Sequence, residues 1–349
     1  MNERKVIDGK AAALMVLLCA IWGMQQVAMK AAAPDMAPVL QVALRSAIAA
    51  ALVFLVVLGR RETWALGGGT WKPGLVVGVL FALEFLFVGE GLRHTNASHM
   101  VIFLYTAPIF AALGLHFVYP EERLTPLQWL GIALAFGGVV TAFTGHGSGA
   151  GSGSGVSVGA GVGAGAGVGG SGGSGGGIGS GGGAQGAGGL MWFGDLLGLA
   201  AGMAYGATTV SIRVSRLASA PATVTLLYQL LGAFVILLAA ALLMGRTHAT
   251  LTPTLLTSLT FQTLIVSFAS FLAWFALLRT YLASRLGVLT FMTPLYGVVF
   301  GVVLLGEKLE PGFILGALMV LAGILLVSSH ELLGKGGRSA AVVTVRIRK

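Results

Sequence analysis

Long apolar stretches, separated by short charged or Gly- and Pro-containing segments, follow one another along almost the whole chain. A bilayer core about 30 Å thick is crossed by about 20 apolar residues in a helix. Ten stretches meet this requirement between Ala11 and Ser329. They predict transmembrane helices at residues 11–31, 38–59, 73–92, 97–118, 126–144, 192–212, 221–244, 255–279, 284–305 and 311–329.

Residues 145–190 interrupt the series between the fifth and sixth predicted helices. This segment consists almost entirely of Gly, Ser, Ala and Val and contains no charged residue. Such a composition is typical of a flexible linker, so we expect a disordered Gly/Ser-rich segment. It divides the chain into a first five-helix unit at 1–144 and a second at 191–330, followed by a basic tail at 331–349.

The two units are related in sequence. Because each unit contains an odd number of helices, the second copy enters the membrane upside down. The sequence therefore predicts an all-α membrane protein with ten transmembrane helices in two inverted five-helix repeats, an architecture that recurs in secondary transporters. At an offset of 186, the matching residues are Leu92-Arg93 with Leu278-Arg279, Ala97-Ser98 with Ala283-Ser284, and Pro108 with Pro294. At an offset of 185, they are Glu122-Arg123-Leu124 with Glu307-Lys308-Leu309, Gly131 with Gly316, and Gly138 with Gly323.

The composition agrees with a membrane protein, because 56% of residues are hydrophobic and only 9% are charged. The net charge of +9 comes from Lys and Arg residues in short loops and tails. Of these 21 residues, 16 fall in segments that are cytoplasmic if the N-terminus is cytoplasmic, four fall outside, and Arg45 lies within a span. This bias predicts a bacterial-type inner membrane protein with both termini cytoplasmic, and it argues against nucleic-acid binding.

Polar residues inside the spans are the candidates for chemistry, since an ionisable group there costs about 2.5–3.5 kcal/mol. Arg45 and Glu84 lie about 10 and 12 Å from the outer ends of their helices, and Gln25 and Gln26 about 8–9 Å. This polar layer is interpreted as a substrate or proton site. The alternative is an interhelical ion pair between Arg45 and Glu84 that only fixes helix packing.

The second unit contains a weaker set of polar and aromatic residues. Aligning Gly23 with Gly202 places Tyr205 opposite Gln26. The remaining candidates for substrate binding are Trp22, Gln229, Ser270, Trp274 and Tyr296, although aromatic residues in spans commonly serve packing alone.

Other polar residues are expected near the helix ends. Glu90, His94 and His99 are expected at the solvated outer mouth, and Glu122 and Glu307 as turn and cap residues. Pro108 and Pro294 should kink their helices and shape a gate or merely a bend.

The chain resembles the EamA-type branch of the drug/metabolite transporter superfamily. The resemblance rests on the duplication, on Pro108 to Gly138 and Pro294 to Gly323, on Trp22-Gly23 and on Arg45. It covers nearly the whole chain except the linker and the tail. It implies export or exchange of small metabolites, such as amino acids or related compounds, by alternating access around a central cavity.

We therefore expect a secondary transporter in the lipid bilayer that carries a small-molecule substrate, with the proton as candidate coupling ion and a homodimer as a candidate assembly. The alternative is a non-transporting membrane protein, such as a lipid-handling enzyme or an assembly factor. The sequence contains no metal-binding, cofactor-binding or nucleotide-binding motif and no cysteine pair. Neither an enzyme nor an ATP-driven pump is expected.

The distribution of basic residues makes the topology testable. Reporter fusions after Gly147 and after Lys349 should be active on opposite sides of the membrane, because five spans separate the two positions. Two reporters active on the same side would contradict the ten-span arrangement.

Overall fold

Helices make up nearly all the regular structure in the computed structural model, which describes residues 9–60, 69–119, 123–144, 188–281, 286 and 289–341. The elements are α1 (Gly9–Ala31), α2 (Pro38–Gly59), α3 (Trp71–Gly91), α4 (Ala97–Leu104), α5 (Ala107–Val118), α6 (Pro126–Thr144), α7 (Gly188–Val214), the 3-10 helix η4 (Arg216–Ser219), α8 (Ala222–Leu243), α9 (Pro253–Thr260), the π-helix η5 (Phe261–Ser270), α10 (Phe271–Thr280), α12 (Met292–Leu305) and α13 (Pro311–Ala341).

These helices correspond to the ten predicted spans. Nine segments of the described chain are long and apolar enough to cross a membrane, and α12 is a shorter apolar helix of 14 residues. The first part of the span predicted at 284–305 and nearly all of the linker predicted at 145–190 lie outside the described residues. Helix α13 continues to Ala341, into the segment predicted as the tail.

Proline marks where several helices begin. Pro38, Pro126, Pro253 and Pro311 are each the first residue of a helix. At this position the missing N–H costs nothing, because the first backbone N–H groups of a helix have no partner within it, and the fixed φ of proline suits the first turn. At the other end of α12, Gly306 adopts a left-handed conformation with φ of 65°, which ends the helix.

Two of the predicted spans are not continuous α-helices. The fourth span breaks at Tyr105 and Thr106, between α4 and α5, directly before Pro108. Pro108 is the second residue of α5, and Pro294 is the third of α12, so both prolines stand in the first turn of a helix. The eighth span contains the ten-residue π-helix η5, which the sequence analysis did not anticipate.

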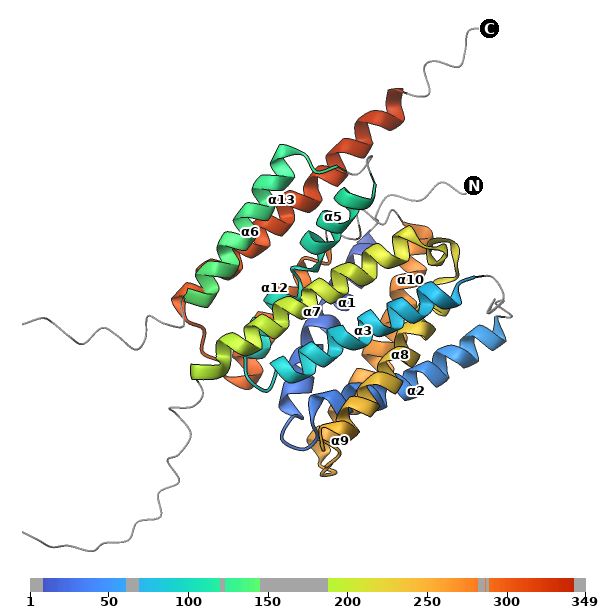
Figure 1. The fold of residues 1–349 in the computed structure, drawn as a ribbon, viewed down its shortest axis with the longest axis vertical. Helices are drawn as coiled ribbons and strands as arrows, with labels where there is room; N and C mark the ends of the chain where they lie inside the picture. Colours follow the sequence, from blue (N-terminus) through green and yellow to red (C-terminus); the bar gives the residue numbers. More distant parts are fainter. Residues whose placement is uncertain are drawn as a thin grey trace, which may run out of the picture.

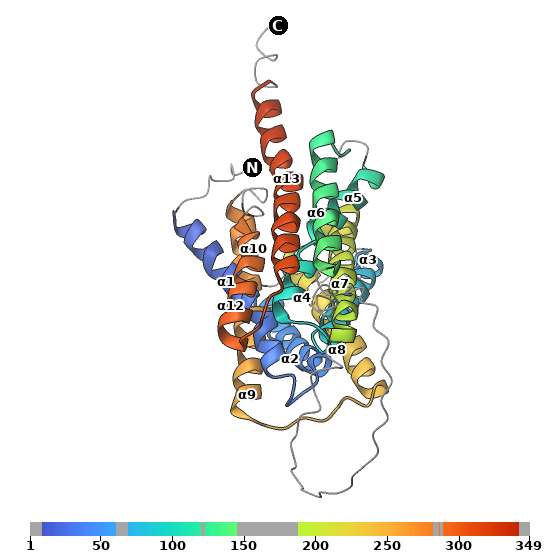
Figure 2. The same cartoon turned by 90° about the vertical axis from the view of Figure 1, so that its left-hand side faces the viewer.

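The helices pack into one bundle with both termini at the same end (Figure 1). We call this the terminus end. The opposite end, here called the loop end, holds the connections at residues 32–37, 92–96 and 244–252. Helices α6 and α13 run side by side along one edge of the bundle in both views (Figure 2).

The packing of α6 against α13 follows the inverted repeat. A Cβ atom at Gly138 would lie 2.5 Å from the carbonyl oxygen of Gly316, and one at Gly131 would lie 2.8 Å from that of Gly323. Gly131 matches Gly316 in the repeat, and Gly138 matches Gly323. Each repeat thus contacts the other through the same pair of positions, as an interface around a two-fold axis requires.

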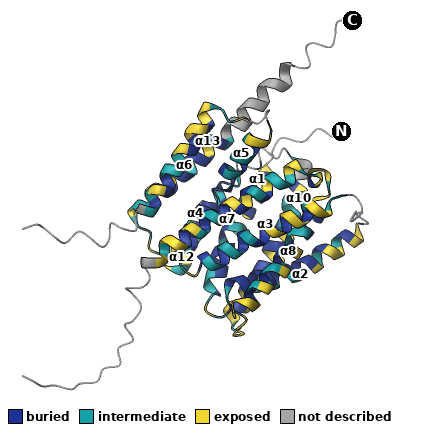
Figure 3. Ribbon diagram, viewed as in Figure 1, coloured by how far each residue is buried: buried dark blue, intermediate teal, exposed yellow. Residues whose placement is uncertain are grey.

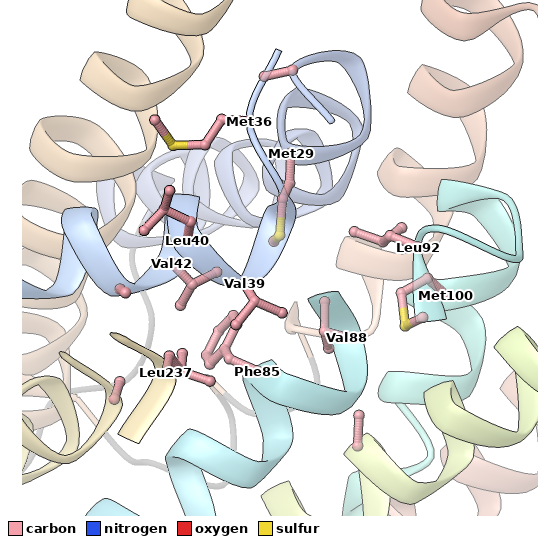
Figure 4. Close-up of a cluster of buried hydrophobic side chains, with 14 of the residues drawn as sticks. Met29, Met36, Val39, Leu40, Val42, Phe85, Val88, Leu92, Met100 and Leu237 are labelled. Carbon is pink, nitrogen blue, oxygen red and sulfur yellow. The ribbon is translucent and has the colours of Figure 1, made fainter. Parts of the chain in front are cut away.

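Apolar side chains fill the interior and also cover the outside. Figure 3 shows exposed residues on the outer faces of α2, α6 and α13, where Leu55, Val140 and Leu318 are exposed. An apolar exterior of this kind suits contact with lipid. In the interior, Met29, Val39 and Phe85 of the first repeat pack in one cluster with residues of the second, including Leu237 (Figure 4). The core is therefore shared between the two repeats.

The close approach of α6 and α13 generates a prediction about stability. Gly138→Ala should lower the free energy of unfolding by about 1–3 kcal/mol, because its Cβ would overlap the Gly316 carbonyl and the Met319 Cβ atom. Thermal unfolding of the purified protein in detergent measures the effect. Gly59→Ala is the control, since a Cβ at Gly59 meets no atom within 4 Å. Equal stability of both variants would contradict the tight contact.

Candidate functional site

Arg45 lies on α2 and is buried, with only 3% of the residue exposed. Its Nη1 atom donates a hydrogen bond to Oε1 of Gln262 at 3.2 Å. Its guanidinium carbon lies 4.6 Å from the centre of the Phe85 ring, within the range of a cation–π interaction. The contact partners come from η5 and α3, so Arg45 links both repeats.

Gln262 is the centre of a buried network of neutral polar groups. Its Nε2 atom donates to Oε1 of Gln41 at 3.0 Å and to Oγ of Ser258 at 2.8 Å. Ser258 in turn donates to the carbonyl of Ala28 at 2.7 Å, and Gln41 donates to that of Met36 at 2.8 Å. The network ties α2 and η5 to the last part of α1 and the connection that follows it.

Sequence reasoning missed Gln262, Gln41 and Ser258. A sequence signal was present, because Gln41 and Gln262 both lie within predicted spans. Glutamines at such positions are as unusual as Gln25 and Gln26, which were predicted as site residues.

Glu84 lies on α3 with 5% exposure, and its Oε2 atom has no hydrogen-bond partner. The carboxylate is within electrostatic range of Arg45 and of the Tyr105 and Tyr205 hydroxyls. However, no ion pair joins Arg45 to Glu84 in the described part of the chain, since Arg45 bonds to Gln262 instead and its Nε atom has no partner. The structure thus brings the two charges near each other without pairing them.

The two tyrosines near Glu84 come from different repeats. Tyr105 caps the C-terminus of α4 at the break in the fourth span and is half-buried. Tyr205 lies on α7 and is 41% exposed. The hydroxyl of Thr293, from the first turn of α12, lies next to Tyr105. Tyr105 and Thr293 were not predicted, although both stand within three residues of the matched prolines Pro108 and Pro294.

Trp22, Ser270 and Trp274 form a second group. The indole Nε1 of Trp22 donates to Oγ of Ser270 at 2.9 Å. The rings of Trp22 and Trp274 meet edge to face, with centroids 5.7 Å apart. The structure therefore brings together three of the predicted candidates, from α1, η5 and α10.

The remaining candidates are more dispersed. Gln26 is 2% exposed and its Oε1 atom has no partner, whereas Gln25, 7% exposed, makes no hydrogen bond within the described residues. Tyr296 stacks on Phe300, with its Cβ atom against Gly23 of α1. Gln229 is half-buried on α8 and likewise has no described hydrogen bond.

A narrow apolar crevice lies between α5, α6 and α7, with no room inside it for a water molecule. Its lining contains no predicted site residue. It consists of Thr106, Ile109, Phe110, Ala135, Phe136, Val139 and Leu199.

The expectation that His99 is solvated is wrong. His99 has no exposed surface, and its Nδ1 atom lies 3.0 Å from Oδ2 of Asp195 on α7. Asp195 is also fully buried and accepts a hydrogen bond from the Thr95 hydroxyl. Asp195 was not predicted, because it stands near the start of its span, where sequence suggests access to water. Packing of α7 against α4 removes that access.

The expectation that Glu307 caps a helix is confirmed, but the helix belongs to the other repeat. Its carboxylate accepts hydrogen bonds from the backbone N–H groups of Ala97 at 2.6 Å and Ser98 at 2.9 Å, at the start of α4. A carboxylate at a helix N-terminus satisfies free N–H groups and complements the helix dipole. Nearby, Lys30 donates to the carbonyls of Leu92 and Thr95.

Comparison of the sequence with protein families shows to which family the chain belongs. The family model described as the EamA-like transporter family matches residues 9–144 and 192–329, which are the two repeats. The chain belongs to the EamA-like transporter family. It is therefore a membrane transporter, with the duplication that its sequence predicts.

Individual relatives agree with this family. An uncharacterized transporter of Bacillus subtilis, YoaV, is 22% identical over 307 residues, which cover 88% of this chain and 92% of YoaV. An uncharacterized transporter of Archaeoglobus fulgidus is 32% identical over 128 residues, covering 36% of this chain and 45% of that protein. A solved crystal structure of a protein at 17% identity has the same fold, with a TM-score of 0.57 over 97% of this chain and 98% of its own.

The network around Gln262 generates a prediction about the EamA-like site. Gln262→Ala should lower the free energy of unfolding by about 1–3 kcal/mol, because Arg45, Gln41 and Ser258 each lose a buried partner. Thermal unfolding in detergent measures the loss. Gln229→Ala removes a glutamine with no described hydrogen bond and should have a smaller effect. A similar loss in both variants would show that the network does not stabilise the fold.

Proposed function

We propose that this membrane transporter is a secondary exporter of small metabolites, such as amino acids or related compounds, and that it works by alternating access. The observation that carries the proposal is that two buried ionisable side chains, Arg45 and Glu84, form no ion pair with each other in a core that both repeats share, and that each has one polar atom without a hydrogen bond. A buried charge without an oppositely charged partner lowers stability. Ionisable side chains that are buried without such a partner therefore point to a role other than stabilising the fold.

The chemistry of these two charges favours a zwitterionic substrate. The free Nε–H of Arg45 can donate to a carboxylate, and the free Oε2 of Glu84 can accept from an ammonium group. An α-amino acid carries both groups on neighbouring atoms. Tyr105 and Tyr205 add hydroxyl groups near Glu84, one from each repeat.

The same arrangement is suited to proton coupling. Glu84 can be neutralised by a proton when no ammonium group is near, and it can release that proton when a cation or Arg45 compensates its charge. Substrate and proton would then compete for one carboxylate. Competition of this kind is sufficient for exchange of an outgoing substrate against an incoming proton.

Orientation and location are part of the proposal. The bias of basic residues supports cytoplasmic termini in a bacterial-type inner membrane, and the two termini lie at one end of the bundle (Figure 1). The loop end would then face the periplasm. The alternative of a lipid-handling enzyme or an assembly factor has no observation in its favour among the described residues.

Transport in everted membrane vesicles tests the function. Vesicles with an acidic lumen should accumulate the substrate, identified by screening labelled amino acids and purines, and collapse of the pH gradient should abolish accumulation. Glu84→Gln should remove the dependence on the gradient but leave exchange of substrate for substrate measurable. Expression should stay near normal, because Arg45 is bonded to Gln262 and not to Glu84.

Two controls sharpen the test. Glu90→Gln changes a carboxylate that pairs with Arg93 and Arg246 at the loop end, and it should retain gradient-driven transport. If Glu84→Gln fails to accumulate in the membrane, the double variant Arg45→Met with Glu84→Gln removes both charges together. Gradient-driven transport by that double variant would rule out Glu84 as the coupling residue.

A further inference from the structure

A second buried group of ionisable side chains lies at the loop end, apart from Arg45 and Glu84. The imidazole of His99, on α4, stacks on the ring of Phe313, with centroids 3.6 Å apart and planes inclined by 5°. One edge of the imidazole faces Asp195 of α7, with Nδ1 3.0 Å from Oδ2. The other edge faces Glu310, directly before α13, with Nε2 3.5 Å from Oε2. His99 belongs to the first repeat, and Asp195 and Glu310 belong to the second.

Asp195 places a second carboxylate against His99. This carboxylate is fully buried, and its hydrogen-bonding neighbours include the Thr95 hydroxyl and His99. A buried carboxylate is stable only with a cation or several hydrogen bonds close by. The other charges in this region are already engaged, since Lys30 donates to backbone carbonyls and Glu307 caps α4. A doubly protonated His99 would place a positive charge directly against the Asp195 carboxylate.

The contact between His99 and Glu310 leads to the same conclusion. When Nδ1 carries the hydrogen that faces Asp195, Nε2 of a neutral imidazole is an acceptor. Oε2 of an ionised Glu310 is also an acceptor, and two acceptors repel each other at 3.5 Å. A single proton on either atom turns the repulsion into attraction. Oε2 of Glu310 and Nε2 of His99 are both buried and have no hydrogen-bond partner, whereas the Glu310 side chain as a whole is 39% exposed.

We propose that His99 and Glu310 form a proton-binding site at the loop end, and that the bound proton, together with Asp195, holds α4 of the first repeat to α7 and α13 of the second. The proton is taken from water at the loop end and returned to it, and no other co-reactant is needed. Its role in transport rests on the proposed function. In an exporter, uptake of this proton would favour closure of the loop end, and its loss would favour opening.

The binding of the proton can be observed directly. The protein contains six histidines, so a sample with ¹⁵N-labelled histidine gives a spectrum simple enough to titrate in detergent. Loss of one signal in His99→Gln assigns His99. If that variant does not fold, replacing the other five histidines in turn assigns the signal by elimination.

Glu310→Gln is the decisive variant. Removing a carboxylate this close should weaken proton binding by His99 about tenfold or more, which moves its titration down by about one pH unit. Glu90→Gln removes a carboxylate at the same end that faces arginines, so it should leave the titration unchanged. Equal titrations in the wild type and Glu310→Gln would overturn the proton site.

Failure of the site and failure of the proposed function are distinguishable, because the titration needs no substrate. If substrate transport is measurable, Glu310→Gln should shift its dependence on the pH at the loop end, whereas Glu90→Gln should not. A shifted titration with unchanged pH dependence of transport would overturn the role of the proton in closing the loop end. Absence of all transport would contradict the proposed function and leave the titration result standing.

Discussion

The bilayer imposes the constraint on which this structure depends: its core contains no water, so buried polar groups must find partners within the protein. Helices meet this requirement for the backbone. For several buried side chains the partner comes from the opposite repeat, as when Arg45 bonds to Gln262 or Asp195 contacts His99. Polar side chains that would destabilise the bundle if they were unsatisfied thus form hydrogen bonds that join its two repeats. Among the side chains that the structure describes, only a few buried atoms are left without a hydrogen bond, and Oε2 of Glu84 is one of them.

In the proposed mechanism, this division between satisfied and unsatisfied groups would separate a rigid part from a reactive part. The network of Gln262, Gln41 and Ser258 uses its donors on side chains and backbone carbonyls, so it fixes α1, α2 and η5 as a frame. Glu84 stands beside this frame with one oxygen free. A transporter needs a rigid part next to a binding group. A side chain that binds and then releases a substrate or a proton has to be held in position by neighbours that stay fixed.

Sequence alone was enough for the spans and the duplication, because apolar length and constant offsets between polar and proline residues are local signals. The matched glycines of α6 and α13 even specify the contact between repeats, as Gly131 and Gly138 pair with Gly323 and Gly316. The π-helix η5 could not be predicted, since its amino-acid composition does not differ from that of the α-helical spans. The burial of His99 and Asp195 was missed for another reason. Each lies near the end of a span, and its access to water depends on how α4 and α7 pack.

If the protein works by alternating access as proposed, the inverted repeat would let closure at one end of the bundle compete with closure at the other. In the two repeats, the α1–α2 connection corresponds to the α7–α8 connection, and the α2–α3 connection corresponds to the α8–α9 connection. The contact between the α1–α2 and α8–α9 connections at the loop end therefore has a counterpart at the terminus end, between the α7–α8 and α2–α3 connections. The first includes a backbone bridge between Met36 and Ala249 and a bond from the Thr252 hydroxyl to Asp35. The second brings the side chain of Arg216 against Gly69. Equal contacts would give two end-closed states of equal energy. Under the proposed alternating access, the differences between the repeats would set which end is closed in the resting protein, and a bound proton or substrate would have to change only that difference.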